Sequence, residues 1–230
     1  AAFSVRLVDC VGYMVDSAVG QFEDLSPRMV MTPWFDHEIP MTEAAEIGTR
    51  KVITDHATVG VVVTTDGTIT DIPREDYREA EERVIRELQD IGKPFVVLVN
   101  SAQPEDPRAA AAAAEIQTRY GVTCRCVNCL TLTEEDIGDI LRDLLYQFPL
   151  RELDVFLPEW VDALPGEHPI RSGLYQEIGE AASQLTRICA LPPCLAALSQ
   201  GENIESAATS TIDLGSGVAQ VEIRLPRRLF

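Results

Sequence analysis

The first 150 residues alternate between short apolar, β-branched runs and longer amphipathic stretches, which restricts this part of the chain to an α/β fold. Because each connection between the apolar runs is long enough to contain a helix, we expect a parallel sheet with helices on both faces. Residues 13–40 are interrupted by glycine and proline and are predicted to form a long loop. Strands are predicted at residues 3–8, 58–64, 95–99 and 122–127, and helices at 42–56, 74–91, 107–120 and 133–146.

Local sequence signals predict where the helices begin and which elements the second half of the chain contains. Thr42 is the expected N-cap of the first helix, and Thr131 or Thr133 that of the fourth. Beyond Pro149 we predict a strand at 150–157, a helix at 172–191 interrupted after its end by two prolines, and an alternating stretch at 211–225. The sequence thus predicts a first domain at 1–150 and the start of a truncated α+β domain at 151–230.

The charge balance excludes some partners. The net charge is −18, from 37 acidic residues against 19 lysines and arginines. An excess of this sign argues against nucleic-acid binding and disfavours direct docking to an anionic membrane. No run of 18 apolar residues is present, so neither a membrane span nor a secretory signal is predicted in this sequence.

Six scattered cysteines favour a reducing cytosol as the compartment. Cys124, Cys126 and Cys129 form a C-x-C-x2-C pattern, but a zinc site needs a fourth ligand and no histidine lies nearby. We therefore favour buried thiols over a metal site. The three histidines follow no metal or catalytic spacing and are predicted to be structural.

Polar residues follow all four predicted strands of the first domain. The strand ends are Asp9, residues 64–66, Asn100 and Asn128. Ligands of parallel sheets bind at the carboxyl ends of the strands, so this edge is the predicted site.

The D-x-x-G spacing of Asp9 and Gly12 suggests a phosphate-handling role. An aspartate after a buried strand can hold Mg²⁺ through water, and the glycine lets the backbone N–H approach a terminal phosphate. The alternative is an aspartate that caps a loop. The long loop that follows favours the functional interpretation, since nucleotide switches occupy such positions. Tyr13 stands where many GTP hydrolases carry a water-orienting glutamine, so we expect slow hydrolysis or a different water-orienting group.

Asn100 and Ser101 are the predicted nucleotide contacts at the end of the third strand. Asn100 occupies the first position of the guanine-reading N-K-x-D motif, but Ser101 replaces the lysine and Gln103 the aspartate. The aspartate pairs with the guanine edge, so its loss favours adenine or a relaxed base preference. The hydroxyl-rich loop at 64–74 could contribute to a site, or it could be a polar turn in which Asp66 caps backbone amides.

Several sequence strings resemble the stage IV sporulation protein A family. They are RLVDCVGY at 6–13, EAAEIGTRKVI at 43–53, VVTTDGTI at 62–69, EAEERVI at 79–85, IGKPF at 91–95 and VNS at 99–101. The resemblance covers about residues 3–160 closely and continues more loosely to GSGVAQVE at 215–222.

This resemblance implies a P-loop NTPase-like fold related to the translation-factor GTPases, with ATP and Mg²⁺ as cofactors. It assigns Asp9 to the Walker B aspartate and Gly12 to its glycine, and it places the Walker A loop upstream of Ala1 and a membrane-localisation region beyond Phe230. Members of the family hydrolyse ATP and self-assemble into the basement layer of the spore coat. They do so in the mother-cell cytoplasm at the outer forespore membrane, recruited by a small amphipathic membrane protein.

Two other functions stay open at this point. One is a Ras-like regulatory GTPase switch, against which the altered guanine motif argues. The other is a catalytically silent scaffold that only polymerises or binds a partner, because no lysine in this sequence is positioned to hold the β- and γ-phosphates.

Overall fold

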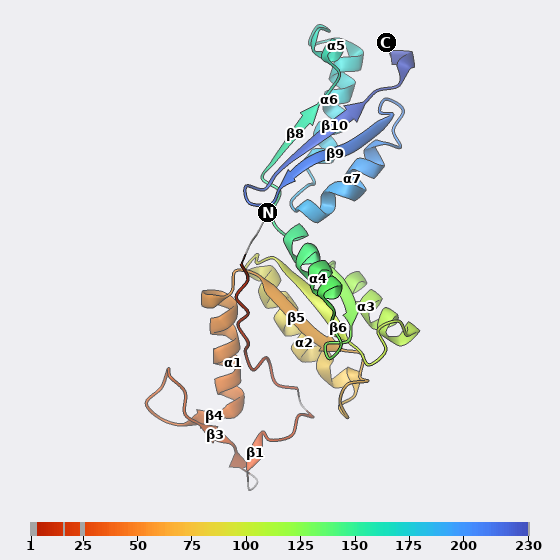
Figure 1. The fold of residues 1–230 in the computed structure, drawn as a ribbon. Coiled ribbons are helices and arrows are strands. Elements are labelled where there is room, and N and C mark those ends of the chain that lie inside the picture. Colours follow the sequence, from red (N-terminus) through yellow and green to blue (C-terminus); the bar gives the residue numbers. More distant parts are fainter. Residues whose placement is uncertain (1–3, 16, 24–25, 230) are drawn as a thin grey trace. The chain divides into compact units, whose positions relative to one another are not determined.

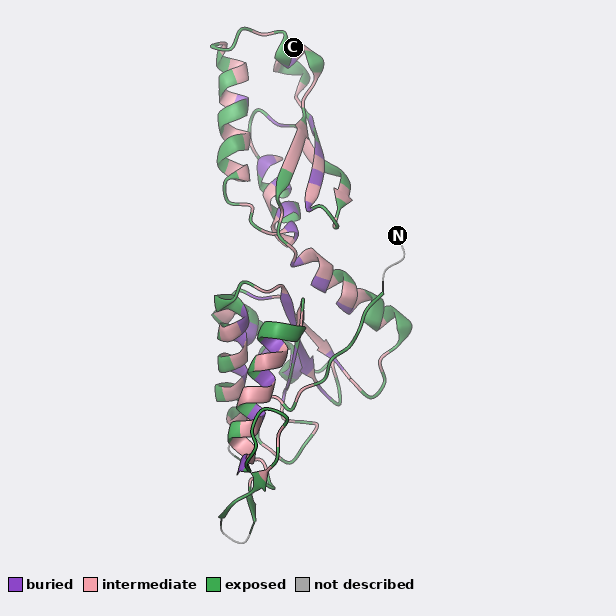
Figure 2. Ribbon diagram, turned by 90° about the vertical axis from the view of Figure 1, so that its left-hand side faces the viewer, coloured by how far each residue is buried: buried purple, intermediate pink, exposed green. Residues whose placement is uncertain are grey.

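The chain folds into two compact units in a computed structural model that describes residues 4–15, 17–23 and 26–229. The units comprise residues 1–141 and 142–230, so the division falls inside helix α4 (Glu134–Tyr146), ahead of the boundary expected at 150. Each unit has its own apolar core. In Figure 2 the buried residues concentrate on the strands and on the helices beside them.

A parallel three-stranded sheet forms the centre of the first unit (Figure 1). Its strands are β5 (Gly60–Thr65), β6 (Phe95–Asn100) and β7 (Cys124–Val127), in that order. Helices α2 (Arg74–Asp90) and α3 (Pro107–Tyr120) connect them. Thr65 pairs with Asn100 and Asn100 with Val127, so the three strands end at the same level. These elements confirm the predicted α/β alternation.

Helices α2 and α3 cover the same face of this sheet. Both connect neighbouring strands in one direction, and right-handed crossovers place such helices on one side. Ile85 of α2 and Ile116 of α3 accordingly belong to one core cluster with Val97 of β6. On the opposite face of β5, Val61 and Val63 are 43% and 56% exposed. The expected cover of helices on both faces is therefore incomplete over β5.

The strand predicted at residues 3–8 is wrong for the residues that the structure describes. Residues 4–10 form no regular secondary structure, and Val5 and Leu7 are exposed. A strand needs a neighbouring strand that pairs with its backbone N–H and C=O groups. Among the described residues no strand pairs with this segment, which leaves its side chains in solvent.

The described residues of the long predicted loop form two short antiparallel ladders. Strand β1 (Phe22–Glu23) pairs with β2 (Ser26–Pro27), and β3 (Met29–Val30) pairs with β4 (Ile39–Pro40). Helix α1 (Met41–Lys51) follows and continues into a π-helical turn, η1 (Val52–His56).

Of the two predicted helix N-caps, the one at α1 is wrong and the one at α4 is confirmed. Thr42 is not the N-cap of α1, because Pro40 precedes the helix and supplies no side-chain hydrogen bond. Thr133 does cap α4: its hydroxyl accepts from the Asp136 amide at 3.2 Å, and the Asp136 carboxylate accepts from the Thr133 amide at 2.8 Å.

The second unit is a mixed α+β arrangement. Strand β10 (Val218–Arg224) lies between β8 (Glu152–Phe156), to which it is parallel, and β9 (Ser206–Asp213), to which it is antiparallel. The helices are α5 (Glu159–Asp162), α6 (Pro169–Ala182) and α7 (Leu191–Leu198), with 3-10 turns η2 (Ile188–Ala190) and η3 (Arg227–Leu229). Leu174 and Leu195 pack against Val221 on one sheet face.

The predicted helix at 172–191 ends earlier than expected. The proline pair begins α7 rather than interrupting the chain, because a proline in the first helical turn loses no hydrogen bond. In neither unit does a described helix combine the length and the apolar character needed to cross a membrane.

Candidate functional site

Asp66 and Ser101 meet at the carboxyl end of the first-unit sheet. Asp66 follows β5 and Ser101 follows β6, and the flush register of these strands brings the two side chains together. Asp66 is 4% exposed and Ser101 is fully buried. The Ser101 hydroxyl donates to Asp66 Oδ2 at 2.7 Å.

Thr68 completes this arrangement, which we call the Asp66 clamp (Asp66, Thr68 and Ser101). The Thr68 hydroxyl and amide donate to Asp66 Oδ1 at 2.6 and 3.0 Å. The hydroxyls of Thr68 and Ser101 also accept hydrogen bonds from the loop that follows β6. Thr68 Oγ1 accepts from the Ala102 amide at 2.9 Å, and Ser101 Oγ accepts from the Gln103 amide at 3.1 Å. One carboxylate thus fixes two successive backbone amides.

The clamp keeps the Asp66 carboxylate ionised. Burial acts to raise its pKa, but the hydrogen bonds from Thr68 and Ser101 favour the charged form and together hold the pKa below the ordinary value of 3.8. The interpretation of Asp66 as a residue that caps backbone amides is confirmed.

Two asparagines join the loop after β6 to the loop after β7. Asn100 Oδ1 accepts from the Cys129 amide at 3.0 Å. Asn128 accepts from the Leu130 amide at 3.0 Å, and its own side-chain amide lies 3.4 Å from the Ala102 carbonyl. The two loops therefore form one ordered edge.

This edge suits a nucleobase better than a phosphate. Phosphates bind free backbone amides and cations, whereas the amides of Ala102 and Gln103 already donate to hydroxyls. Arg74, the cation that contacts Thr64 of β5 at 3.5 Å, forms a buried ion pair with Glu81 at 2.8 Å. The exposed side chain of Gln103 remains as a hydrogen-bonding group for a ligand.

The structure places Asp9 and Gly12 away from this edge. Asp9 is exposed, and Gly12 has a left-handed φ of 82° with open space around it. Tyr13, the next residue, donates a hydrogen bond to Glu87 in the last turn of α2. That turn leads into the amino end of β6, so Asp9 and Gly12 are not brought together with Asn100 and Ser101.

Ser101, one of the two predicted nucleotide contacts at the end of β6, is buried instead of being open to a ligand. Its hydroxyl is occupied by Asp66 and the Gln103 amide, and none of its surface is exposed. Its role as a direct nucleotide contact stays a prediction. Sequence reasoning missed Thr68, although the D-G-T string after a strand is a typical Asx-turn signal that could have found it.

The cysteine cluster consists of free, partly buried thiols. Cys124 and Cys126 pack against the core of the first unit. Burial, aided by the nearby Cys126, raises the pKa of the Cys124 thiol to about 12, so it stays protonated and unreactive. Within the described ranges, no three His, Cys, Asp or Glu side chains are grouped to hold a metal ion.

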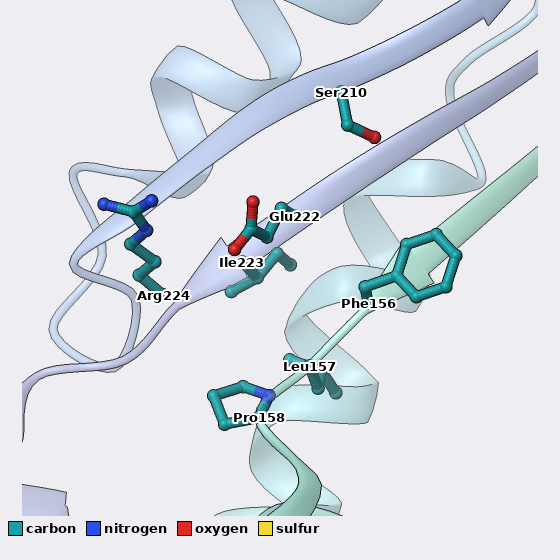
Figure 3. Close-up of a pocket in the computed structure, with 7 residues that line it drawn as sticks. All are labelled: Phe156, Leu157, Pro158, Ser210, Glu222, Ile223 and Arg224. Carbon is teal, nitrogen blue, oxygen red and sulfur yellow. The ribbon is translucent and has the colours of Figure 1, made fainter.

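A pocket of about 420 Å³ lies in the second unit at the ends of β8 and β10 (Figure 3). It is lined by Phe156, Leu157, Pro158, Ser210, Glu222, Ile223 and Arg224. Its charged groups are one acid and one base, so it offers neither a cation cluster for phosphates nor a set of metal ligands.

Comparison with known proteins assigns both parts of the chain. Residues 1–149 match the model of the stage IV sporulation protein A ATPase domain, and residues 150–230 match that of its middle domain. No solved structure matches the chain.

Three curated relatives are all named stage IV sporulation protein A. The protein of Bacillus subtilis (strain 168) is 43% identical over 227 residues, which is 99% of this chain and 46% of the relative. The protein of Bacillus anthracis is 42% identical over the same length and the same shares. That of Clostridioides difficile (strain 630) is 37% identical over 229 residues, 100% of this chain and 47% of the relative. The chain thus spans about half the length of the curated relatives it matches.

Proposed function

The chain belongs to the stage IV sporulation protein A family, and from this premise we propose that it is part of an ATP-hydrolysing morphogenetic protein of the spore coat. The match of residues 1–149 to the ATPase-domain model carries the proposal. A parallel sheet with flanking helices and an ordered polar carboxyl edge supports it, since nucleotides bind at such edges.

The edge supports ATP rather than GTP as the nucleotide. Guanine-specific loops present a carboxylate to the N1–H and N2–H donors of the base. Here Gln103 stands at that position, and the clamp buries the neighbouring Ser101. An amide can accept from the adenine amino group and donate to its ring nitrogen. We assign Asn100 and Ser101 to the nucleotide-binding loop on this basis.

Asp9 and Gly12 are the residues we assign to Mg²⁺ and the terminal phosphate. Asp9 is exposed, so its carboxylate is accessible to an ion that it would hold through water. The φ of Gly12 and the open space around it allow a close backbone approach. Bound Mg²⁺ neutralises charge on the phosphates. The chain contains no G-x-x-x-x-G-K-[ST] string, so activity has to be tested on the full-length protein.

We further propose that ATP hydrolysis drives self-assembly into the basement layer of the spore coat. The assembly forms in the mother-cell cytoplasm at the outer forespore membrane, beside other coat proteins. The net charge of −18 opposes direct binding to anionic lipid, which supports recruitment by a small amphipathic membrane protein. A silent scaffold is the second candidate, favoured by the separation of Asp9 from the Asn100 edge.

Sedimentation of the full-length protein tests the assembly. We expect the protein to pellet with Mg·ATP and to stay in the supernatant with Mg²⁺ alone. Mg·GTP and a non-hydrolysable ATP analogue are the controls, and each should pellet less protein. Equal pelleting in all four samples would contradict nucleotide-driven assembly and favour the scaffold.

A further inference from the structure

We propose that Leu130 is a binding residue for the nucleobase, and that its side chain packs against the flat face of the adenine whose edge Gln103 recognises. The inference rests on the proposed ATPase function, because that function assigns the loop after β6 to the base. It adds to the binding site a second loop, the one that follows β7, and gives this loop an apolar contact with the ligand.

Leu130 lies at the tip of a tight turn after β7, which we call the Leu130 turn (residues 128–131). The Thr131 amide donates to the Asn128 carbonyl at 3.1 Å, so Cys129 and Leu130 are the two central residues of the turn. Turns are usually built from glycine, proline, asparagine, aspartate or serine. A leucine at the tip is unusual, since its side chain is left in solvent: Leu130 is 90% exposed.

The polar edge of the sheet holds this turn in place. Asn128 Oδ1 accepts from the Leu130 amide at 3.0 Å, and Asn100 Oδ1 accepts from the Cys129 amide at 3.0 Å. Together with the Thr131 bond, three successive amides of the turn have fixed partners. An apolar side chain on a fixed backbone loses little conformational freedom when a ligand packs on it, so Leu130 is a pre-organised contact.

Asn128 also joins the Leu130 turn to the loop that carries Gln103. Its side-chain amide donates to the Ala102 carbonyl at 3.4 Å, while its side-chain oxygen accepts from the Leu130 amide. Gln103 directly follows Ala102, and its side chain is exposed. One carboxamide thus brings an exposed polar side chain and an exposed apolar side chain to the same edge of the sheet.

A nucleobase is recognised by this combination of groups. Its edge carries hydrogen-bond donors and acceptors, and its faces are flat π surfaces that gain by leaving water. Gln103 can pair with the edge of adenine while Leu130 covers one face. A phosphate does not suit the Leu130 turn, because the turn has no cation and its amides already donate to protein oxygens.

The alternative role of an exposed leucine is a contact with another copy of the chain. The two roles predict different results. A leucine on the face of the base strengthens binding of ATP and GTP alike, because a face contact does not read the edge, and it leaves a phosphate chain without a base unaffected. A leucine that contacts a second copy changes sedimentation without changing nucleotide affinity.

Equilibrium binding to the full-length protein tests Leu130 without relying on hydrolysis. The probes are Mg·ATP, Mg·GTP and inorganic tripolyphosphate, which has the phosphate chain but no base. We expect Leu130→Ala to weaken ATP and GTP binding by about tenfold and to leave tripolyphosphate binding unchanged. Gln103→Ala should weaken ATP binding more than GTP binding. Ile91→Ala, 42% exposed just beyond α2, is the matched control and should change none of the three.

Leu130→Trp gives a second measurement at the same position. Its indole offers a larger flat surface, so we expect ATP to bind at least as tightly as in the wild type. ATP should also quench the added fluorescence, whereas tripolyphosphate should not. Absence of quenching at saturating ATP would contradict a contact between residue 130 and the base.

The outcomes separate this inference from the proposed function. If the wild type binds ATP and Leu130→Ala binds it equally well, the role of Leu130 is overturned and the proposed function stands. An equal loss for ATP and tripolyphosphate also overturns it, since the effect would not act through the base. If the wild type binds no ATP, the proposed function fails and the role of Leu130 fails with it.

Discussion

Asp66 is almost fully buried, yet its carboxylate stays charged because three hydrogen bonds from Thr68 and Ser101 satisfy it. Each hydroxyl that donates to Asp66 also accepts from a backbone amide of the next loop. The position of that loop therefore depends on the ionisation of one residue.

We expect Asp66→Asn to lower the free energy of unfolding by about 2 kcal/mol at pH 7, because an amide cannot accept from both hydroxyls as a carboxylate does. The pKa of Asp66 is lower in the folded than in the unfolded protein. Its stabilising effect is therefore complete above the ordinary pKa of 3.8 and is lost as pH falls through the folded-state pKa.

Urea unfolding at several pH values measures this difference. Asp71→Asn, at an exposed position in the same loop, is the control and should change stability little. A loss in Asp66→Asn that is unchanged well below pH 3.8 would show that ionisation is not the cause.

The link between η1 and β6 depends on Lys93. Its ammonium group donates to the carbonyls of Ile53, Thr54 and Ala57 at 2.5, 2.8 and 2.7 Å. These carbonyls end the π-helical turn and have no helical partner beyond it. Lys93 thus fixes the end of η1, a few residues before β5 begins at Gly60.

Lys93→Met should keep the aliphatic stem and remove the three bonds, and so destabilise the protein by about 1–2 kcal/mol. Thermal unfolding followed by circular dichroism measures the change. Lys51→Met is the matched control, since among the described residues the Lys51 ammonium group contacts only the Trp34 ring, at 6.0 Å. An equal effect in both variants would contradict the capping role.

Elements with a strong local pattern were predictable from the sequence. Helix α3 begins and ends at the predicted residues, because Asp106 caps it, Pro107 opens it and Gly121 closes it in the left-handed region. The segment at 3–8 also has a strand-like pattern, but a local pattern cannot supply the neighbouring strand with which such a segment has to pair.

The candidate site was predictable in part. Polar strand ends and the D-G turn indicated the carboxyl edge and the capping by Asp66. The bond between Asp66 and Ser101 depends on the register of β5 and β6, which links residues far apart in sequence. The docking of Tyr13 on Arg83 and Glu87 is likewise a tertiary contact without a local signal.

The whole chain combines a nucleotide-type α/β unit with a smaller α+β unit, each with its own core. The first unit has an ordered edge suited to a base, and a separate segment that carries the residues assigned to Mg²⁺ and phosphate. An ATPase account requires that these two parts come together in the full-length protein. Our assignment of Gln103 to the position at which guanine-specific loops carry an aspartate further requires that ATP be preferred to GTP.

Turnover of Mg·ATP and Mg·GTP by the full-length protein tests this account most directly. We predict faster hydrolysis of ATP than of GTP, and a loss of about 10- to 100-fold in Asp9→Ala because the metal loses the group that orients its water. Asp55→Ala, an exposed acid of the same unit, should keep full activity. Equal rates with GTP, or full ATP turnover in Asp9→Ala, would contradict the account.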